Sequence, residues 1–264
     1  MEGINIVKIC DNNLILEINY LSSELKEKIK DNLVEICHGE YGLASSSKHM
    51  SLNGTITELS SRITEDKTKR VGIVGELLLN VVIREFSKEF SNMRIISPFF
   101  NIEDRSFKKG FDIISIDHNK KIWLIESKAG EQGNFKTSTD KLCERLMEAK
   151  NDLSLRLKEN NSQLWLNAIK TVHSSLIEND EKKTIMNILE NNSNSSKVND
   201  KNVILGGTVF CIVQQKINSK KIIDLYKQIF NSKCFLEIKI IAIQKTTFED
   251  VIDFLITLNK DKNE

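Results

Sequence analysis

The stretch "GFDIISIDHNKKIWLIESKAG", residues 110–130, predicts a β-hairpin, because two apolar arms flank a polar turn. The arms are rich in Ile, Leu and Trp, which predicts that the hairpin lies in a core. Yet the arms also carry Asp112, Glu126 and Lys128. Burying a charge destabilises a protein strongly unless a partner compensates it. The hairpin therefore predicts either a functional site or a structural charge pairing.

The length of the hairpin loop decides whether these charges meet. Side chains alternate along a strand, so Glu126 and Lys128 point the same way. A loop of three residues (118–120) or of five residues pairs Asp112 with Glu126, whereas a loop of two or four residues puts Asp112 opposite Ile125 and facing away from Glu126. We expect the first register, because it makes one continuous Ile/Leu face with the charges at one end. That register also pairs Ile116 with Ile122 and Ile114 with Leu124.

The three charged residues form a minimal site for metal-dependent phosphodiester hydrolysis. Two neighbouring carboxylates repel each other unless a cation lies between them. Mg²⁺ (or Mn²⁺) prefers oxygen ligands, and Mg²⁺ usually takes one or two protein carboxylates. Asp112 and Glu126 are therefore the candidate metal ligands, and Lys128 is the candidate residue that orients a water or stabilises charge on a phosphate. A salt bridge at the strand end is the simpler alternative, since Glu-x-Lys alone is a weak signal.

Two further groups of charged residues accompany the hairpin. Glu76, in the predicted helix "GIVGELLLNVVIREF" (residues 72–86), shares a face with Leu79 and Ile83 and is a candidate third metal ligand. A first-turn glutamate stabilised by the helix dipole explains Glu76 equally well. Lys141 and Arg145 lie four residues apart on the next predicted helix and could contact a DNA backbone, although a solvated helix face is the simpler interpretation.

Asp112 together with Glu126-Ser127-Lys128 resembles the active site of the PD-(D/E)XK nuclease superfamily. In that superfamily an acid on one strand and an E-x-K on the next strand form the site. The proline of the motif is absent, and Gly110 and Phe111 precede Asp112 instead. The segments 72–86, "KKGFDIISID" (108–117) and "IWLIESKA" (122–129) also resemble the HamA family, the nuclease component of the Hachiman antiphage defence systems.

The resemblance implies a nuclease-type fold and a defence function. The implied fold is α/β (α+β), with a mixed sheet flanked by helices. The implied activity is Mg²⁺-dependent DNA cleavage, restrained or directed by a HamB-like superfamily-2 helicase partner. An acid from the helix of Glu76 often joins the metal site in this superfamily. Two alternatives stay open: an inactive nuclease-fold module that binds DNA or a partner, and a restriction-type endonuclease.

Strands interleaved with helices predict the same α/β (α+β) class without the resemblance. Apolar runs at residues 203–215 and 235–244 are separated by a predicted helix, which indicates a parallel pair of strands. We divide the chain into a small N-terminal unit (1–60), which docks a partner or extends the sheet, and a nuclease-like domain (61–264). The segment 139–191 of that domain is helical in character, and the Gly/Ser-rich segment 38–55 predicts a loop.

Composition restricts the remaining function classes. A net charge of +1 and a pI of about 7.6 give no global signal for nucleic acid, although a local groove can still be basic. Five scattered cysteines without a CxxC pair predict neither a disulfide framework nor a zinc site. No signal-like leader and no apolar run long enough to cross a bilayer are present, so we expect a cytoplasmic protein without membrane contact.

Overall fold

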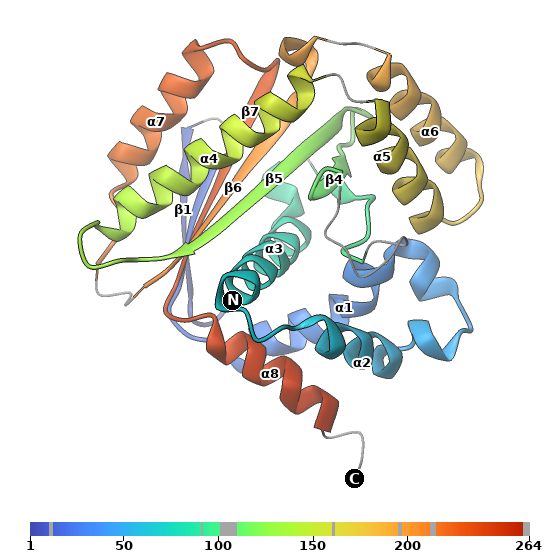
Figure 1. Cartoon of the computed structure of the whole chain (residues 1–264), viewed down its shortest axis with the longest axis horizontal. Coiled ribbons are helices and arrows are strands. Elements are labelled where there is room, and N and C mark those ends of the chain that lie inside the picture. The colour runs from blue at the N-terminus through green and yellow to red at the C-terminus, as the bar shows by residue number, and fades with distance from the viewer. Residues whose placement is uncertain are drawn as a thin grey trace.

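A computed structural model describes residues 1–10, 13–90, 92–100, 110–159, 162–194, 197–211 and 215–260. One mixed sheet of seven strands runs through the molecule (Figure 1). Its strands are β1 (Ile4–Ile9), β2 (Asn13–Ile18), β3 (Arg94–Ile95), β4 (Ile113–Ile116), β5 (Ile122–Glu131), β6 (Asn202–Phe210) and β7 (Glu237–Lys245). They lie side by side in the order β1-β2-β7-β6-β5-β4-β3. The predicted mixed sheet flanked by helices is confirmed.

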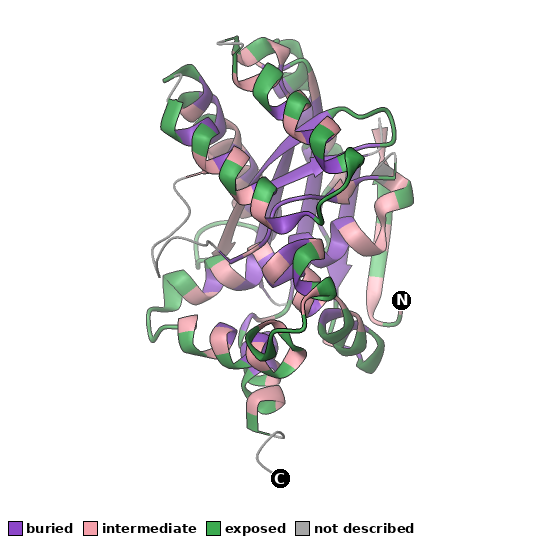
Figure 2. Ribbon diagram, turned by 90° about the vertical axis from the view of Figure 1, so that its right-hand side faces the viewer, coloured by how far each residue is buried: buried purple, intermediate pink, exposed green. Residues whose placement is uncertain are grey.

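Helices cover both faces of this sheet and enclose one core on each side. The α-helices of the described residues are α1 (Ser23–Ala44), α2 (Leu52–Arg62), α3 (Lys67–Glu85), α4 (Ser138–Lys158), α5 (Ser162–Ser175), α6 (Asp180–Ser193), α7 (Ser219–Asn231) and α8 (Glu249–Lys260). Short 3₁₀ turns are η2 (Lys48–Met50), η3 (Ser87–Phe90) and η4 (Val198–Asp200). One core contains α1, α2, α3 and α8, and the other contains α4 to α7. Figure 2 shows the buried sheet between these layers.

The central strands pair in parallel, and helices cover them on both faces, as is usual for parallel strands joined by helical crossovers. β6 and β7 pair in parallel, with α7 as the connection between them, as the sequence predicted. Both strands are buried almost throughout, which suits long apolar runs without polar alternation. β5 pairs in parallel with β6 and antiparallel with β4. The hairpin is thus joined to the centre of the sheet through its second arm.

Residues 1–60 contribute to the same sheet rather than standing apart from it. β1 pairs antiparallel with β2, and β2 pairs in parallel with β7. Side chains of α1 and α2 join the core that also contains α3 and α8. The strands β1 and β2 thus extend the sheet beyond β7, and docking of a partner by residues 1–60 stays a prediction.

The predicted loop at 38–55 is wrong over much of its length. α1 continues to Ala44, and α2 begins at Leu52 with Ser51 as its N-cap, whose hydroxyl accepts a hydrogen bond from the Gly54 amide at 3.2 Å. Gly39 bends α1 with a φ of +74°, and a Cβ at this position would lie 2.5 Å from the Cβ of Ser175. The Gly and Ser residues of this segment serve a bend and a cap, which composition alone does not distinguish from a loop.

The helical segment is confirmed, since α4, α5 and α6 fill most of residues 139–191. Over the described residues, every helix is too short or too polar to span a bilayer.

Candidate functional site on the hairpin

The β4–β5 hairpin has the predicted register. Ile114 pairs with Leu124 and Ile116 with Ile122. The amide of Asp117 donates to the carbonyl of Lys121 at 3.1 Å, which closes a loop of three residues, 118–120. Lys120, with φ of +61°, supplies the left-handed residue that such loops commonly contain. The loop length that makes Asp112 and Glu126 neighbours is therefore the one that the protein adopts.

A buried carboxylate that the sequence analysis did not single out fixes this loop. Asp117 Oδ1 accepts hydrogen bonds from the amides of Asn119 and Lys121, both at 2.9 Å. Its Oδ2 accepts one from Trp123 Nε1 at 3.0 Å. An Asp that bonds to amides further along the chain is typical of tight turns, so the sequence contained this signal. Asp117 therefore sets the register that the candidate site depends on.

Asp112 lies immediately before β4, at the level of Glu126. Its Oδ2 accepts a hydrogen bond from the backbone amide of Ser127 at 2.8 Å, which links the two arms where the register predicts contact. The Asp112 carboxylate is close enough to Glu126 that its negative charge contributes to a raised pKa of Glu126. The structure thus brings together the two carboxylates that the sequence analysis paired.

Glu126 is the most constrained charged side chain of the site, with no exposed surface. Its Oε1 lies 2.9 Å from Lys128 Nζ, and its Oε2 contacts the guanidinium of Arg156. Apart from these two ion pairs, neither oxygen accepts a hydrogen bond from a backbone amide or a hydroxyl among the described residues. Burial, and then the charge of Asp112, raise the pKa of Glu126 to about 8 against the opposing effects of Arg156 and Lys128. The carboxylate has cations nearby but unused acceptor capacity.

Lys128 connects Glu126 to helix α4. Its Nζ lies 2.8 Å from Asp152 Oδ2, in addition to its contact with Glu126. Burial lowers the pKa of Lys128, but Glu126 and Asp152 outweigh burial, so this pKa lies above its ordinary value. The ammonium group therefore remains charged at neutral pH.

Both residues that α4 contributes to this cluster were absent from the sites predicted from the sequence. Asp152 and Arg156 lie four positions apart, so they share a face of α4 one helical turn from each other. The only signal was this spacing of opposite charges, and it is equally typical of an exposed helix surface. The spacing of residues within α4 does not show which strand the helix covers, because that depends on tertiary packing.

Glu76 belongs to a helix that packs on the other face of the sheet from α4. It lies on α3, whose Gly75 approaches β5 so closely that a Cβ there would lie 2.4 Å from the Cβ of Ala129. Ala129 points to the face opposite that of Glu126 and Lys128, because side chains alternate along the strand. Among the residues that the structure describes, no three His, Cys, Asp or Glu side chains lie close enough to share a metal ion. The role of Glu76 as a third ligand remains a prediction.

The basic residues at the start of α4 are paired with acids of the same helix. Glu144 contacts Lys136 and, at 2.9 Å, Lys141, and hydrogen bonds from these two lysines first of all lower its pKa to about 2. Arg145 contacts Glu144 and lies 2.7 Å from Glu148. Contact of Lys141 or Arg145 with a DNA backbone would have to compete with these ion pairs.

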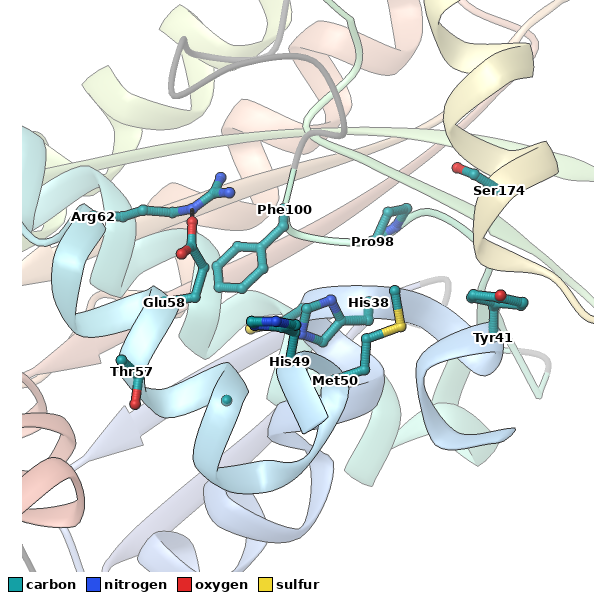
Figure 3. Close-up of a pocket in the computed structure, with 12 residues that line it drawn as sticks. His38, Tyr41, His49, Met50, Thr57, Glu58, Arg62, Pro98, Phe100 and Ser174 are labelled. Carbon is teal, nitrogen blue, oxygen red and sulfur yellow. Dashed lines mark hydrogen bonds and ion pairs between the residues drawn. The ribbon is translucent and has the colours of Figure 1, made fainter. Parts of the chain in front are cut away.

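A pocket of about 700 Å³ lies elsewhere in the molecule, between α1, η2, α2 and the segment 98–100 (Figure 3). Its His38 ring meets the ring of Phe100 edge-on at 5.2 Å, and the Arg62 guanidinium lies 4.3 Å from the Phe100 ring centre. Burial lowers the pKa of His38. The pocket lining contains an ion pair of its own, between Arg62 and Glu58 at 2.7 Å, but none of the hairpin charges. The hairpin is the candidate site because its fully buried carboxylate, Glu126, lies beside a second acid, Asp112.

Fold and site together define an α+β protein in which acidic and basic side chains surround a buried carboxylate, Glu126, on a central strand of a mixed sheet. The chain belongs to the HamA family, whose sequence model matches residues 3–258. No curated protein and no solved structure matches the chain. The family match indicates an antiphage defence protein in the context of the Hachiman systems, and it includes β1 and β2 as well as the hairpin.

Proposed function

We propose that this protein is a metal-dependent DNA nuclease whose site is Asp112, Glu126 and Lys128. The observation that carries the proposal is the buried Glu126 carboxylate, which lies beside Asp112, contacts Lys128 and Arg156, and accepts no hydrogen bond from a backbone amide or a hydroxyl among the described residues. An acid that is raised in pKa by burial and by a second acid is typical of functional sites. Membership of the HamA family supports the same function through its defence context.

The donor set fits a hard divalent cation. Asp112 and Glu126 offer carboxylate oxygens from neighbouring arms of one hairpin, and the Glu126 oxygens have acceptor capacity left over. Mg²⁺ and Mn²⁺ prefer such ligands and complete their coordination with water and phosphate. A bound divalent cation supplies charge neutralisation at the phosphate and a lower pKa for a coordinated water. Glu76 would add a third ligand only if it reached the site from the α3 layer.

Lys128 performs the remaining chemistry in this proposal. Its ammonium, held between Glu126 and Asp152, would donate hydrogen bonds that orient the attacking water or stabilise charge growing on the phosphate. Its raised pKa favours the charged form, which suits electrostatic stabilisation better than proton abstraction. We therefore assign Lys128 to positioning and charge stabilisation.

A partner that restrains or directs cleavage completes the proposal. A free nuclease endangers the DNA of its host, and the Hachiman context makes a superfamily-2 helicase the expected partner. The helical segment α4 to α6 offers a surface for it, because Leu155, Leu166 and Ile177 are exposed there. Exposed large apolar side chains on a polar layer are candidates for interface contacts.

Cleavage of linear and circular plasmid DNA with Mg²⁺ or Mn²⁺ tests the proposed activity. Wild type and Lys128→Ala are compared, alone and with a superfamily-2 helicase if one is encoded beside the gene. We expect metal-dependent degradation by wild type in at least one of these combinations. Loss of Lys128 should reduce the rate by at least about 100-fold, since removing one charge-stabilising group typically has that effect.

Other outcomes would support the alternatives. Equal inactivity of wild type and Lys128→Ala in every combination would contradict the proposal and favour a binding module with a nuclease fold. Discrete fragments in place of general degradation would indicate a restriction-type endonuclease.

A further inference from the structure

Charged side chains of α4 face side chains of opposite charge on β5. Asp152 contacts Lys128, and Arg156 contacts Glu126. Four residues of a helix advance by about 6 Å, and two residues of a strand advance by about 6.6 Å. One turn of α4 therefore matches the separation of Glu126 and Lys128 along β5, and each strand charge meets an opposite charge on the helix.

Arg156 makes a second contact that an ordinary ion pair does not require. One of its guanidinium nitrogens, Nη2, contacts Glu126 Oε2, and the other, Nη1, donates to the carbonyl of Gly110 at 2.7 Å. Gly110 lies two residues before Asp112 on the arm leading into β4. The planar guanidinium thus bridges the two arms of the hairpin, at the end where both candidate metal ligands lie.

We propose that Arg156 is a positioning residue of the metal site, and this inference rests on the proposed function. By holding Glu126 and Gly110 at once, Arg156 fixes the Glu126 carboxylate relative to the arm that carries Asp112. Residues that hold a metal ligand in place influence metal affinity although they do not touch the metal. A lysine has no fork of donors that could span both acceptors, so the role requires arginine.

The test measures Mn²⁺ binding to the full chain without DNA, by calorimetry and by the electron paramagnetic resonance of free Mn²⁺. Arg156→Met should raise the Kd for Mn²⁺ by about 10- to 100-fold. Arg156→Lys should raise it as well, because it keeps the charge and loses the bridge. Asp112→Asn tests the metal site itself and should reduce binding strongly.

Arg70→Met is the matched control. The Arg70 side chain is 28% exposed, as Arg156 is at 27%. Arg70 also bridges a backbone carbonyl and a glutamate, since its Nε donates to the Thr64 carbonyl at 2.6 Å and its Nη2 lies 3.1 Å from Glu65. It contacts the chain before α3, outside the candidate site, so Mn²⁺ affinity should stay at the wild-type value.

The outcomes separate this inference from the proposed function. Wild-type or tighter Mn²⁺ binding by both Arg156 variants would overturn the positioning role, and tighter binding would show that the guanidinium competes with the metal. Wild-type binding by Asp112→Asn, or no binding by wild type, would instead refute the metal site. If Arg156→Met does not fold, Arg156→Lys decides the question alone.

Discussion

At the scale of single residues, Glu126 is where stability and the candidate chemistry conflict. A fully buried carboxylate beside a second acid destabilises the fold when it is ionised, even with Lys128 and Arg156 in contact. Fold stability alone would favour an apolar residue at this position. A site that must hold a cation has a reason to keep the acid.

The raised pKa of Glu126 predicts a pH-dependent stability of a definite sign. The folded state holds this proton more tightly than the unfolded chain does, because the pKa rises from 4.5 to about 8 on folding. The free energy of unfolding should therefore fall as pH rises through this window, and the loss should be complete above about pH 8. In Glu126→Gln this contribution disappears, so the variant should gain stability over wild type as pH increases.

Urea unfolding in metal-free buffer between about pH 5 and about pH 8.5 measures this difference. Glu131→Gln, at the exposed end of the same strand, should follow the wild-type slope. Parallel slopes for wild type and Glu126→Gln would mean that the pKa of Glu126 is not raised in the folded protein.

At the scale of elements, the hairpin was predictable and its surroundings were not. Alternation and loop length were enough to derive the pairing of Ile114 with Leu124, because both are local properties of one stretch of chain. The contacts of Asp152 and Arg156 depend on which strand α4 crosses, which is decided by packing across the whole core. The helices at 38–44 and 52–55 were missed because residues that cap or bend a helix also occur in loops.

Loss of the Asp117 carboxylate should destabilise the β4–β5 hairpin. Asp117→Ala would leave the buried Trp123 Nε1 and the amides of Asn119 and Lys121 without their acceptor. A buried donor left unsatisfied costs about 1–3 kcal/mol, so the free energy of unfolding should fall by at least that amount. Mn²⁺ affinity should fall as well if the register is lost.

Chemical unfolding of Asp117→Ala beside His118→Ala measures this effect. His118 is the exposed neighbour in the same loop, so its variant should stay within about 0.5 kcal/mol of wild type. Equal stability of the two variants would show that the loop does not depend on the Asp117 carboxylate.

At the scale of the whole molecule, the sheet separates two layers with different tasks. The layer of α1, α2, α3 and α8 contains the pocket residues on α1 and α2, and the layer of α4 to α7 provides the helix that touches the candidate site. Because α4 contacts Glu126 and Lys128 and also begins the helical segment α4 to α6, a partner bound there would lie on elements continuous with the site. Such an arrangement offers a physical route for a partner to restrain the proposed cleavage.

We therefore predict that the proposed helicase partner binds the α4–α6 surface. Replacing exposed apolar side chains of that surface by charged ones should disrupt docking, because an unpaired charge buried at an interface is costly. The protein core should be unaffected, since these side chains are exposed. The double variant Leu166→Asp with Ile177→Asp should bind the partner at least about tenfold more weakly, as loss of interface anchors typically causes, and copurification should fall accordingly.

Phe230→Asp, an equally exposed position on α7, is the control and should bind as wild type does. Metal-dependent cleavage by the isolated chain, where it occurs, should be unchanged in both variants, which separates loss of docking from loss of the site. Wild-type affinity of the double variant would exclude this surface, and a loss confined to Phe230→Asp would move the interface to α7.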